Sequence, residues 1–138
     1  METMLVELLK ALADQTRLRI AVLLDRGGDL CSCEIETILG LEQSNASRHL
    51  RRLREAGVLN SYKKAQWVHY QVNRELFSSY PFLWEVLQTA AREVERTGRD
   101  VALLEDYRAQ GYSCRTIHRW QPQVSAVYMQ MEEINEPE

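Results

Sequence analysis

The chain has 138 residues, of which 45% are apolar and 27% charged, a composition typical of one soluble globular domain. No apolar run approaches the roughly 18 residues that a membrane span needs, and three cysteines are too few for a disulfide scaffold. The first residues, METMLVELLKALADQ, have helical spacing and an acid at position 2, unlike a signal peptide. We therefore expect a cytoplasmic protein, in which a close pair of thiols indicates metal binding or redox chemistry.

The net charge of −3 conceals an asymmetry along the chain. Residues 48–64 hold six basic side chains and one acid, a local charge of +5, which leaves −8 for the rest. A basic face on an acidic body is typical of a phosphate-binding surface. A solvated helix face without a partner would give the same pattern, so charge alone leaves both interpretations open.

Apolar side chains recur at helical spacing through the first forty residues. A helix over 4–12 is predicted by leucines at positions i, i+3, i+4 and i+7, namely Leu5, Leu8, Leu9 and Leu12. Asp14 is suited to cap a second helix, which starts near Gln15, is apolar over a wide arc and ends at residues 26–28. A third helix is expected from residue 30 or 32 to residue 39, before Gly40.

The stretch LEQSNASRHLRRLREAGVL predicts a fourth helix. Ser44 is the expected N-cap, Gly57 is the expected C-cap, and the buried face is marked by Ala46, Leu50 and Leu53. Two short helices joined by about four residues predict a helix-turn-helix. In that motif the second helix enters the major groove of DNA.

The remaining sequence predicts a hairpin followed by further helices. Alternation in SYKKAQWVHYQV indicates two strands with a tip at residues 64–66. Pro81 opens a long helix that is expected to end near Gly98, and another helical piece covers about 100–110. The last stretch, QVSAVYMQMEEINEPE, carries four acids and no base, so we expect it to be weakly ordered or ordered only against a partner chain.

The predicted order of elements is that of a winged helix: helices, a helix-turn-helix, a two-stranded wing and a long helix. Four motifs also resemble those of the ArsR/SmtB family of bacterial metal-sensing repressors. LADQTRLRIAVLL (12–24) is similar to the family's second helix and DLCSCEI (29–35) to its ELCxCDL metal box. QSNASRHLRRLREAGVL (43–59) is similar to its recognition helix and WVHYQV (67–72) to the second strand of its wing. The resemblance implies an α+β, mainly α, winged helix-turn-helix homodimer built on the first and last helices. It also implies that the metal-free form binds operator DNA and that metal binding releases it.

The resemblance covers about residues 5–95. We accordingly expect residues 1–98 to form the DNA-binding and dimerisation domain and residues 99–138 a C-terminal extension, partly helical and then acidic. Ala65 stands where the family's wing tip often has Gly, and Glu36 stands where some arsenic sensors carry a further cysteine. No histidine lies between His69 and His118, so the second zinc site that some members have on the long helix is not expected.

The predicted metal ligands are Cys31, Cys33 and Cys114. Thiolates select soft ions, and three sulfurs suit As(III) or Sb(III), whereas Cd(II), Pb(II) and Zn(II) are alternatives that favour other ligand numbers. In an ideal helix Cys31 and Cys33 would point about 200° apart, so we expect joint binding to open the first turn and act as a switch. Cys114, from the same or the partner chain, would tune affinity. Small buried thiols without a ligand remain the alternative.

The residues expected to meet DNA all lie between positions 43 and 64: Gln43, Ser44, Asn45, Ser47, Arg48, His49, Arg51, Arg52, Lys63 and Lys64. Gln and Asn suit adenine and Arg suits guanine, so the first part of the recognition helix is expected to face the groove. The two serines and the later basic residues are expected to contact phosphates. A solvated surface charge is the alternative for each of them.

These observations predict a transcriptional repressor that releases its operator when As(III) or Sb(III) binds cysteine thiolates. A Cd(II)- or Pb(II)-responsive repressor and a thiol-redox or persulfide sensor of the same fold stay open. A thiol enzyme is disfavoured, because the chain lacks a CxxC redox pair and a glycine-rich nucleotide loop. We therefore expect no enzymatic activity.

Overall fold

The computed structural model of the protein describes residues 3–122. The acidic stretch 123–138, expected to be weakly ordered, lies outside the described residues. Along the described chain the elements are α1 (Met4–Leu12), α2 (Gln15–Gly27), β1 (Leu30–Cys31), α3 (Ser32–Leu39), α4 (Gln43–Glu55), β2 (Leu59–Lys64), β3 (Trp67–Val72), α5 (Arg74–Ser79), α6 (Phe82–Glu93), α7 (Thr97–Ala109) and the short 3-10 helix η1 (Ile117–Arg119). None of the helices within residues 3–122 is long and apolar enough to span a bilayer.

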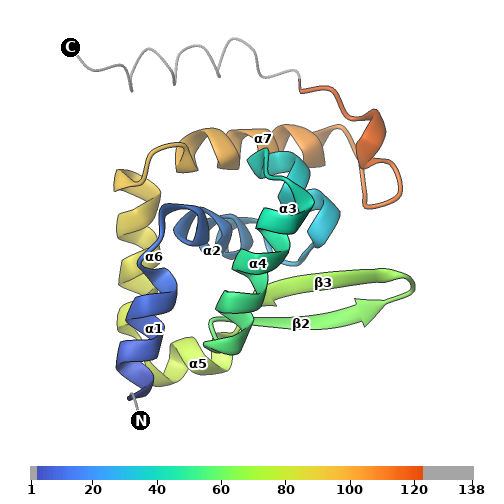
Figure 1. Ribbon diagram of the computed structural model, residues 1–138. Helices are drawn as coiled ribbons and strands as arrows, with labels where there is room; N and C mark the ends of the chain where they lie inside the picture. The colour runs from blue at the N-terminus through green and yellow to red at the C-terminus, as the bar shows by residue number, and fades with distance from the viewer. Residues whose placement is uncertain (1–2, 123–138) are drawn as a thin grey trace, which may run out of the picture.

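Helix α2 forms the centre of the core, with α6 and α7 packed around it and the wing projecting to one side (Figure 1). Its N-cap is Asp14, whose side chain accepts a hydrogen bond from the backbone N–H of Arg17, as expected. Ile20, Ala21 and Leu23 are fully buried. The wide apolar arc of this helix therefore contacts neighbours on several sides, which confirms the sequence interpretation.

Helices α3 and α4 form the helix-turn-helix, and Gly40 makes the turn between them in the left-handed region with φ 69°. Glu42, not Ser44, occupies the N-cap of α4, because the helix begins one residue before the serine. At the other end Ala56 is the C-cap and Gly57 follows it with φ 86°. The predicted helix is thus confirmed, with its start and its cap shifted by a residue or two.

The wing is an antiparallel hairpin of β2 and β3, paired from Leu59↔Val72 to Lys64↔Trp67. Its two-residue turn places Ala65 at φ 54°, a conformation that glycine adopts at lower cost. The sheet has a third strand that the sequence did not predict, because β1 pairs with β3 in the order β1-β3-β2. This strand takes residues 30 and 31 out of the expected third helix, which starts at Ser32.

The C-terminal helices differ from expectation in their bounds. The predicted long helix ends at Glu93 rather than near Gly98, because Val94 is extended and Arg96 takes a left-handed conformation with φ 78°. Helix α7 begins at Thr97 and crosses the molecule over α2 (Figure 1). The division into domains at residue 98 stays a prediction.

Two contacts anchor α7 to the rest of the fold. The Asp100 carboxylate, 2% exposed, accepts hydrogen bonds of 2.8 and 2.9 Å from Arg19, whose guanidinium also donates to the Leu39 carbonyl at the end of α3. Near the end of α2, a Cβ built on Gly27 would lie 2.4 Å from Leu104 Cδ2. A larger residue at position 27 would therefore require the Leu104 side chain to move.

Candidate metal site and nucleic-acid face

Cys31 is the last residue of β1 and the N-cap of α3, with extended backbone angles of φ −80° and ψ 164°. It pairs with His69 of the wing and is 1% exposed. Because Cys31 precedes the first helical residue, the helical spacing of 200° between Cys31 and Cys33 does not apply. The premise of that expectation, that both cysteines lie in one regular helical turn, is therefore wrong.

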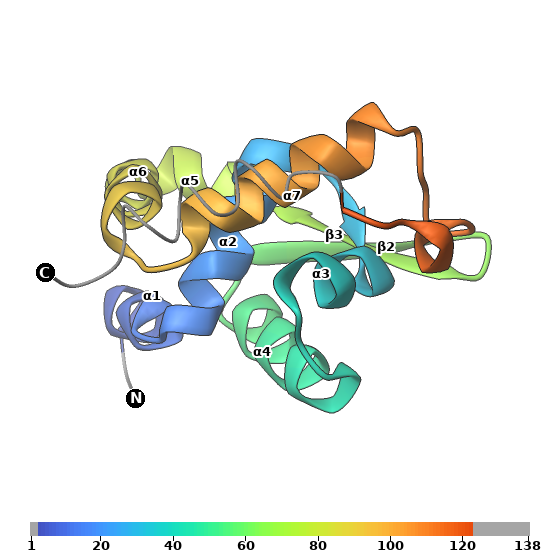
Figure 2. The ribbon, with the colours of Figure 1, turned by 90° about the horizontal axis from the view of Figure 1, so that it is seen from above.

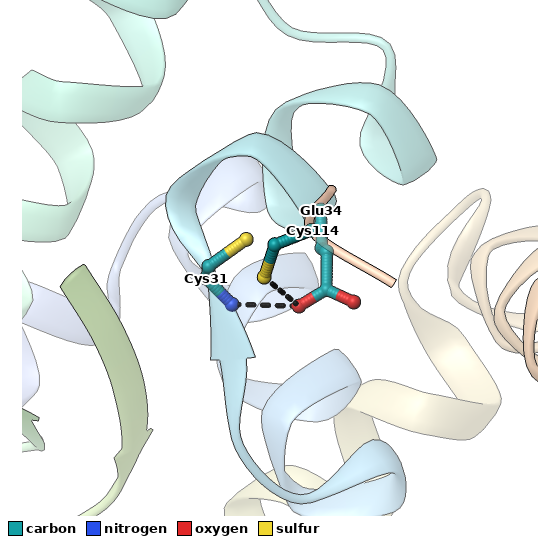
Figure 3. Close-up of side chains that lie close together, drawn as sticks. All are labelled: Cys31, Glu34 and Cys114. Atoms are coloured by element: carbon teal, nitrogen blue, oxygen red, sulfur yellow. Dashed lines mark hydrogen bonds between the residues drawn. The ribbon is translucent and has the colours of Figure 1, made fainter. Parts of the chain in front are cut away.

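Glu34, at the third position of α3, closes a capping box with Cys31. Its Oε1 accepts the backbone N–H of Cys31 at 2.9 Å, and its Oε2 accepts the Tyr107 hydroxyl of α7 at 2.5 Å. The side chain is almost completely buried, since Glu34 is 8% exposed. The carboxylate is therefore held at both oxygens. Figure 3 shows the hydrogen bond that Oε1 accepts from the Cys31 N–H at the end of β1.

Cys114 reaches the same carboxylate from the segment that follows α7. Its Sγ donates to Glu34 Oε1 over 3.4 Å, although the two residues lie 80 positions apart in the chain (Figure 3). Aromatic contacts hold the segment on α7: Tyr107 stacks on Tyr112 with ring centroids 6.3 Å apart and meets Trp120 edge-on at 5.3 Å. Trp120 Nε1 also donates to Asp106 at 2.9 Å. The extension thus presents its thiol to the end of β1 within one chain.

The ligand atoms of Cys31, Glu34 and Cys114 all lie within 4.8 Å of one another, a spacing compatible with a single bound ion. We call these three residues the thiol-carboxylate cluster. Cys33, the third predicted ligand, is half-buried and lies outside the cluster. Glu34 was missed by the sequence interpretation, which weighed only Glu36. The signal available was its position three residues after Cys31, where an acid completes a capping box.

Burial raises the pKa of the Cys31 thiol far above its ordinary value, and the neighbouring Cys114 thiol and Glu34 carboxylate raise it further. Burial also raises the pKa of Cys114, and the charge of Glu34 adds to this effect. For Tyr107, burial and the hydrogen bond that the hydroxyl donates to Glu34 raise the pKa. The cluster is therefore a protonated pair of thiols around a buried carboxylate, which allows Cys114 to donate its S–H to Glu34.

The predicted DNA-binding residues lie on α4 and on the wing (Figure 2). Those with exposed side chains are Gln43, Ser44, Ser47, Arg48, Arg51, Lys63 and Lys64, whereas Asn45 and Arg52 are half-buried. We call these nine residues the basic face. Arg48 donates to the Asn45 side chain at 2.6 Å, and Arg52 lies 3.6 Å from Glu7 of α1. Arg48, Arg51, Lys63 and Lys64 are thus accessible to a phosphate backbone, whereas Arg52 is paired with Glu7.

His49 is the exception among the predicted residues. It lies on the inner side of α4 with Ala46 and Leu50, is only 9% exposed, and has Nδ1 3.3 Å from Arg17 and 4.0 Å from Asp14. Its expected place on the groove-facing half is wrong, because positions 46, 49, 50 and 53 form the buried stripe of this helix. Burial, together with Arg17 and Arg48, lowers the pKa of His49 despite the opposing effect of Asp14.

The sequence and the fold are similar to those of known proteins. Residues 14–61 match the arsR family of bacterial regulatory proteins. The chain is 37% identical over 97 residues to the arsenic resistance transcriptional regulator ArsR2 of Pseudomonas putida, a match that covers 70% of this chain and 82% of that protein. The chain belongs to the ArsR family. The resemblance drawn from its motifs is thereby confirmed.

Two further ArsR-family comparisons define how far the likeness extends. The arsenic resistance transcriptional regulator ArsR1 of Pseudomonas putida is 49% identical over 67 residues, which are 49% of this chain and 52% of that protein. This match therefore spans about half the length of that relative. The fold is also similar to a solved homodimeric winged helix-turn-helix DNA-binding domain from Mycobacterium bovis, described as a possible ArsR-family transcriptional regulator. The TM-score is 0.55 and the sequence identity is 26%, and the match covers 67% of this chain and 82% of that domain. The winged helix-turn-helix fold is confirmed.

Proposed function

We propose that this protein is a dimeric repressor of transcription that binds operator DNA in the cytoplasm and releases it when As(III) or Sb(III) binds its cysteine thiols. The observation that carries the proposal is the proximity of Cys31 and Cys114 at the start of α3, the helix that precedes the predicted recognition helix. The arsenic resistance regulators among its relatives support the same inducer class.

The chemistry of the cluster suits a trivalent metalloid. Thiols are soft ligands, and arsenous acid brings hydroxyl groups that can leave. Each As–S bond forms as one As–OH group departs with the thiol proton as water, so the raised pKa of Cys31 and Cys114 does not prevent the exchange. Cys33, the second residue of α3, would supply the third sulfur. Because it lies outside the cluster, its recruitment would displace the first turn of α3.

Such a displacement would reach the DNA-binding helix by direct packing. Helix α3 contacts α4, and only Gly40, Leu41 and Glu42 separate the two helices. Arg19 also binds the carbonyl of Leu39 at the end of α3. A shift of α3 would therefore change the position of α4 relative to the core, and an ion that binds the shifted form better lowers DNA affinity.

A second copy of the chain is proposed to cover the side formed by α1 and α6, which lie next to each other in both views (Figures 1 and 2). Helix α1 leaves Met4, Leu5 and Leu9 between 46% and 49% exposed. A mainly apolar groove of about 470 Å³ runs along α6 and is closed by Leu18 of α2. Exposed apolar surface of this kind favours association, and a twofold dimer would present two recognition helices to successive major grooves.

The experiment is a gel-shift titration of the protein with arsenite on its own promoter DNA, followed in parallel by ultraviolet absorbance of As–S bonds. We expect release of DNA at the arsenite concentration at which the thiols are occupied. Occupied thiols without release would refute an arsenite-responsive repressor, and sedimentation of the protein as a monomer at micromolar concentration would refute the dimer.

The same proximity favours one alternative, a thiol-redox sensor. The two sulfurs of Cys31 and Cys114 lie within 4.8 Å, so a small movement would allow a disulfide. Peroxide would take up the two electrons and two protons of the thiols and yield two water molecules. Mass spectrometry after peroxide treatment distinguishes the cases, because a redox sensor would form the Cys31–Cys114 disulfide and lose DNA affinity without arsenite.

A further inference from the structure

The third member of the thiol-carboxylate cluster is an oxygen ligand that the arsenic chemistry leaves unused. The carboxylate of Glu34 accepts hydrogen bonds from the Cys31 N–H, the Cys114 thiol and the Tyr107 hydroxyl, all of them neutral donors. Within residues 3–122 no lysine or arginine forms an ion pair with it. A buried carboxylate without a cation is costly, and a bound metal ion would offset this cost.

Carboxylate oxygen is a poor ligand for As(III), but it is a common one for divalent ions that also bind sulfur. Two thiolates and one carboxylate supply negative charge for a divalent cation, and a fourth position can take water. Binding would release both thiol protons to solvent, because a divalent cation brings no hydroxyl groups of its own. The donor set of the cluster therefore fits Cd(II), Zn(II) or Pb(II) as it stands in the structure.

We propose that Glu34 is the third ligand of a divalent thiophilic cation bound by Cys31 and Cys114, and that Cys33 takes this place when the ligand is arsenite. The inference rests on the thiol site of the proposed function but not on arsenite as the inducer. Two classes of ligand would then share two sulfurs and differ in the third ligand. Glu34 would decide the response to divalent ions and Cys33 the response to As(III).

The geometry provides a matched control on the same helix. Glu36 is also an acid of α3 and half-buried, but it lies outside the cluster. Glu34→Gln removes the negative charge while its amide oxygen can still accept the Cys31 N–H, so the capping box keeps one hydrogen bond. Glu36→Gln makes the same chemical change at a position that the proposal gives no role.

The test uses the full-length metal-free protein and its Glu34→Gln, Cys33→Ser and Glu36→Gln variants, each titrated with cadmium chloride and with sodium arsenite. Binding is followed by ultraviolet absorbance of the metal–sulfur bonds in competition with a chelator. We expect Glu34→Gln to weaken Cd(II) binding by about 10- to 100-fold and to leave arsenite binding nearly unchanged. Cys33→Ser should weaken arsenite and spare Cd(II), and Glu36→Gln should change neither.

X-ray absorption at the cadmium edge tests the wild-type protein directly, even if Glu34→Gln does not fold. Two sulfur neighbours with oxygen in the remaining positions are expected, whereas three or four sulfurs would overturn the proposal. Wild-type affinity for Cd(II) in folded Glu34→Gln would overturn it as well. A wild-type protein that binds Cd(II) through Glu34 but ignores arsenite would support this assignment and refute the proposed arsenite response, so the two failures are distinguishable.

Discussion

The thiol-carboxylate cluster and the basic face differ in how their residues come together. The cluster is mostly buried, with Cys114 half-buried, and joins Cys31 and Glu34 to a cysteine 80 positions after Glu34. The basic face is largely exposed and takes its residues from the continuous stretch 43–64. Substitutions in the cluster should therefore change the response to an ion and often stability, whereas those on the face should change DNA affinity with little effect on the fold.

The largest effect is expected from the cluster thiols. Cys31→Ser or Cys114→Ser should abolish release of DNA by arsenite, since one remaining cluster sulfur cannot hold the ion, while DNA affinity without arsenite stays at the wild-type level. Cys33→Ser should still bind arsenite more weakly through Cys31 and Cys114, but it should not release DNA, because recruitment of Cys33 displaces α3. A gel-shift titration across the three variants, followed in parallel by ultraviolet absorbance of the As–S bonds, measures release and binding separately. The sequence analysis assigned Cys114 only a tuning role, so release of DNA by Cys114→Ser at a raised arsenite dose would restore that role.

Substitutions on the basic face should divide into two kinds. Arg48→Ala, at an exposed position in the first half of α4, should cost about 1–3 kcal/mol of binding free energy and relax sequence preference, as expected of a base contact. Lys64→Ala, at the tip of the wing, should weaken binding to all sequences alike and lower the salt dependence by about one counterion. Affinities for operator and unrelated DNA at several salt concentrations give both quantities. Equal losses on both DNAs for Arg48→Ala would contradict its groove position.

The hydroxyl of Tyr107 should contribute to stability through Glu34. Tyr107→Phe leaves Glu34 Oε2 without its donor, and a buried unsatisfied acceptor costs about 1–3 kcal/mol of unfolding free energy. Tyr112→Phe is the matched control, because the Tyr112 ring packs on Tyr107 but its hydroxyl has no hydrogen bond with the residues that the structure describes. Urea unfolding of both variants measures the difference. Equal stabilities would show that the Tyr107–Glu34 hydrogen bond is not important for the fold.

The smallest effect is expected at His49, whose contribution to the stability of the fold changes with pH. Burial, Arg17 and Arg48 lower its pKa below the ordinary value of 6.5, and only Asp14 opposes them. The unfolded chain therefore binds a proton at a higher pH than the folded protein, so the contribution of His49 to stability is full above pH 6.5 and is lost as the pH falls through the folded pKa. His49→Gln should reduce this loss in urea unfolding at pH values on both sides of 6.5. The same substitution at the exposed His118 serves as the control, and an unchanged pH dependence in His49→Gln would exclude the effect.

Much of the fold could be predicted because the relevant interactions are local. Leucine spacing gave α1, alternation gave the wing, and Gly40 marked the turn before α4. The expectations that failed depend on contacts distant in sequence: β1 forms only because β3 lies beside it, and His49 is buried because α4 packs against the start of α2. Local periodicity carries no information about which partner covers a face.

The sequence by itself determined the winged helix-turn-helix, the basic charge of its second helix and the presence of two neighbouring thiols at the start of α3, since each is encoded in a short continuous motif. Only the tertiary structure decided that Cys31 is joined by Cys114 and Glu34 while Cys33 stays apart. Two long-range features are responsible. The pairing of β1 with β3 keeps Cys31 out of the helix, and the aromatic contacts of Tyr107 fold the C-terminal segment back onto α7 so that Cys114 reaches the carboxylate. Side chains 80 positions apart meet only when packing brings their elements together, because no local spacing rule relates them.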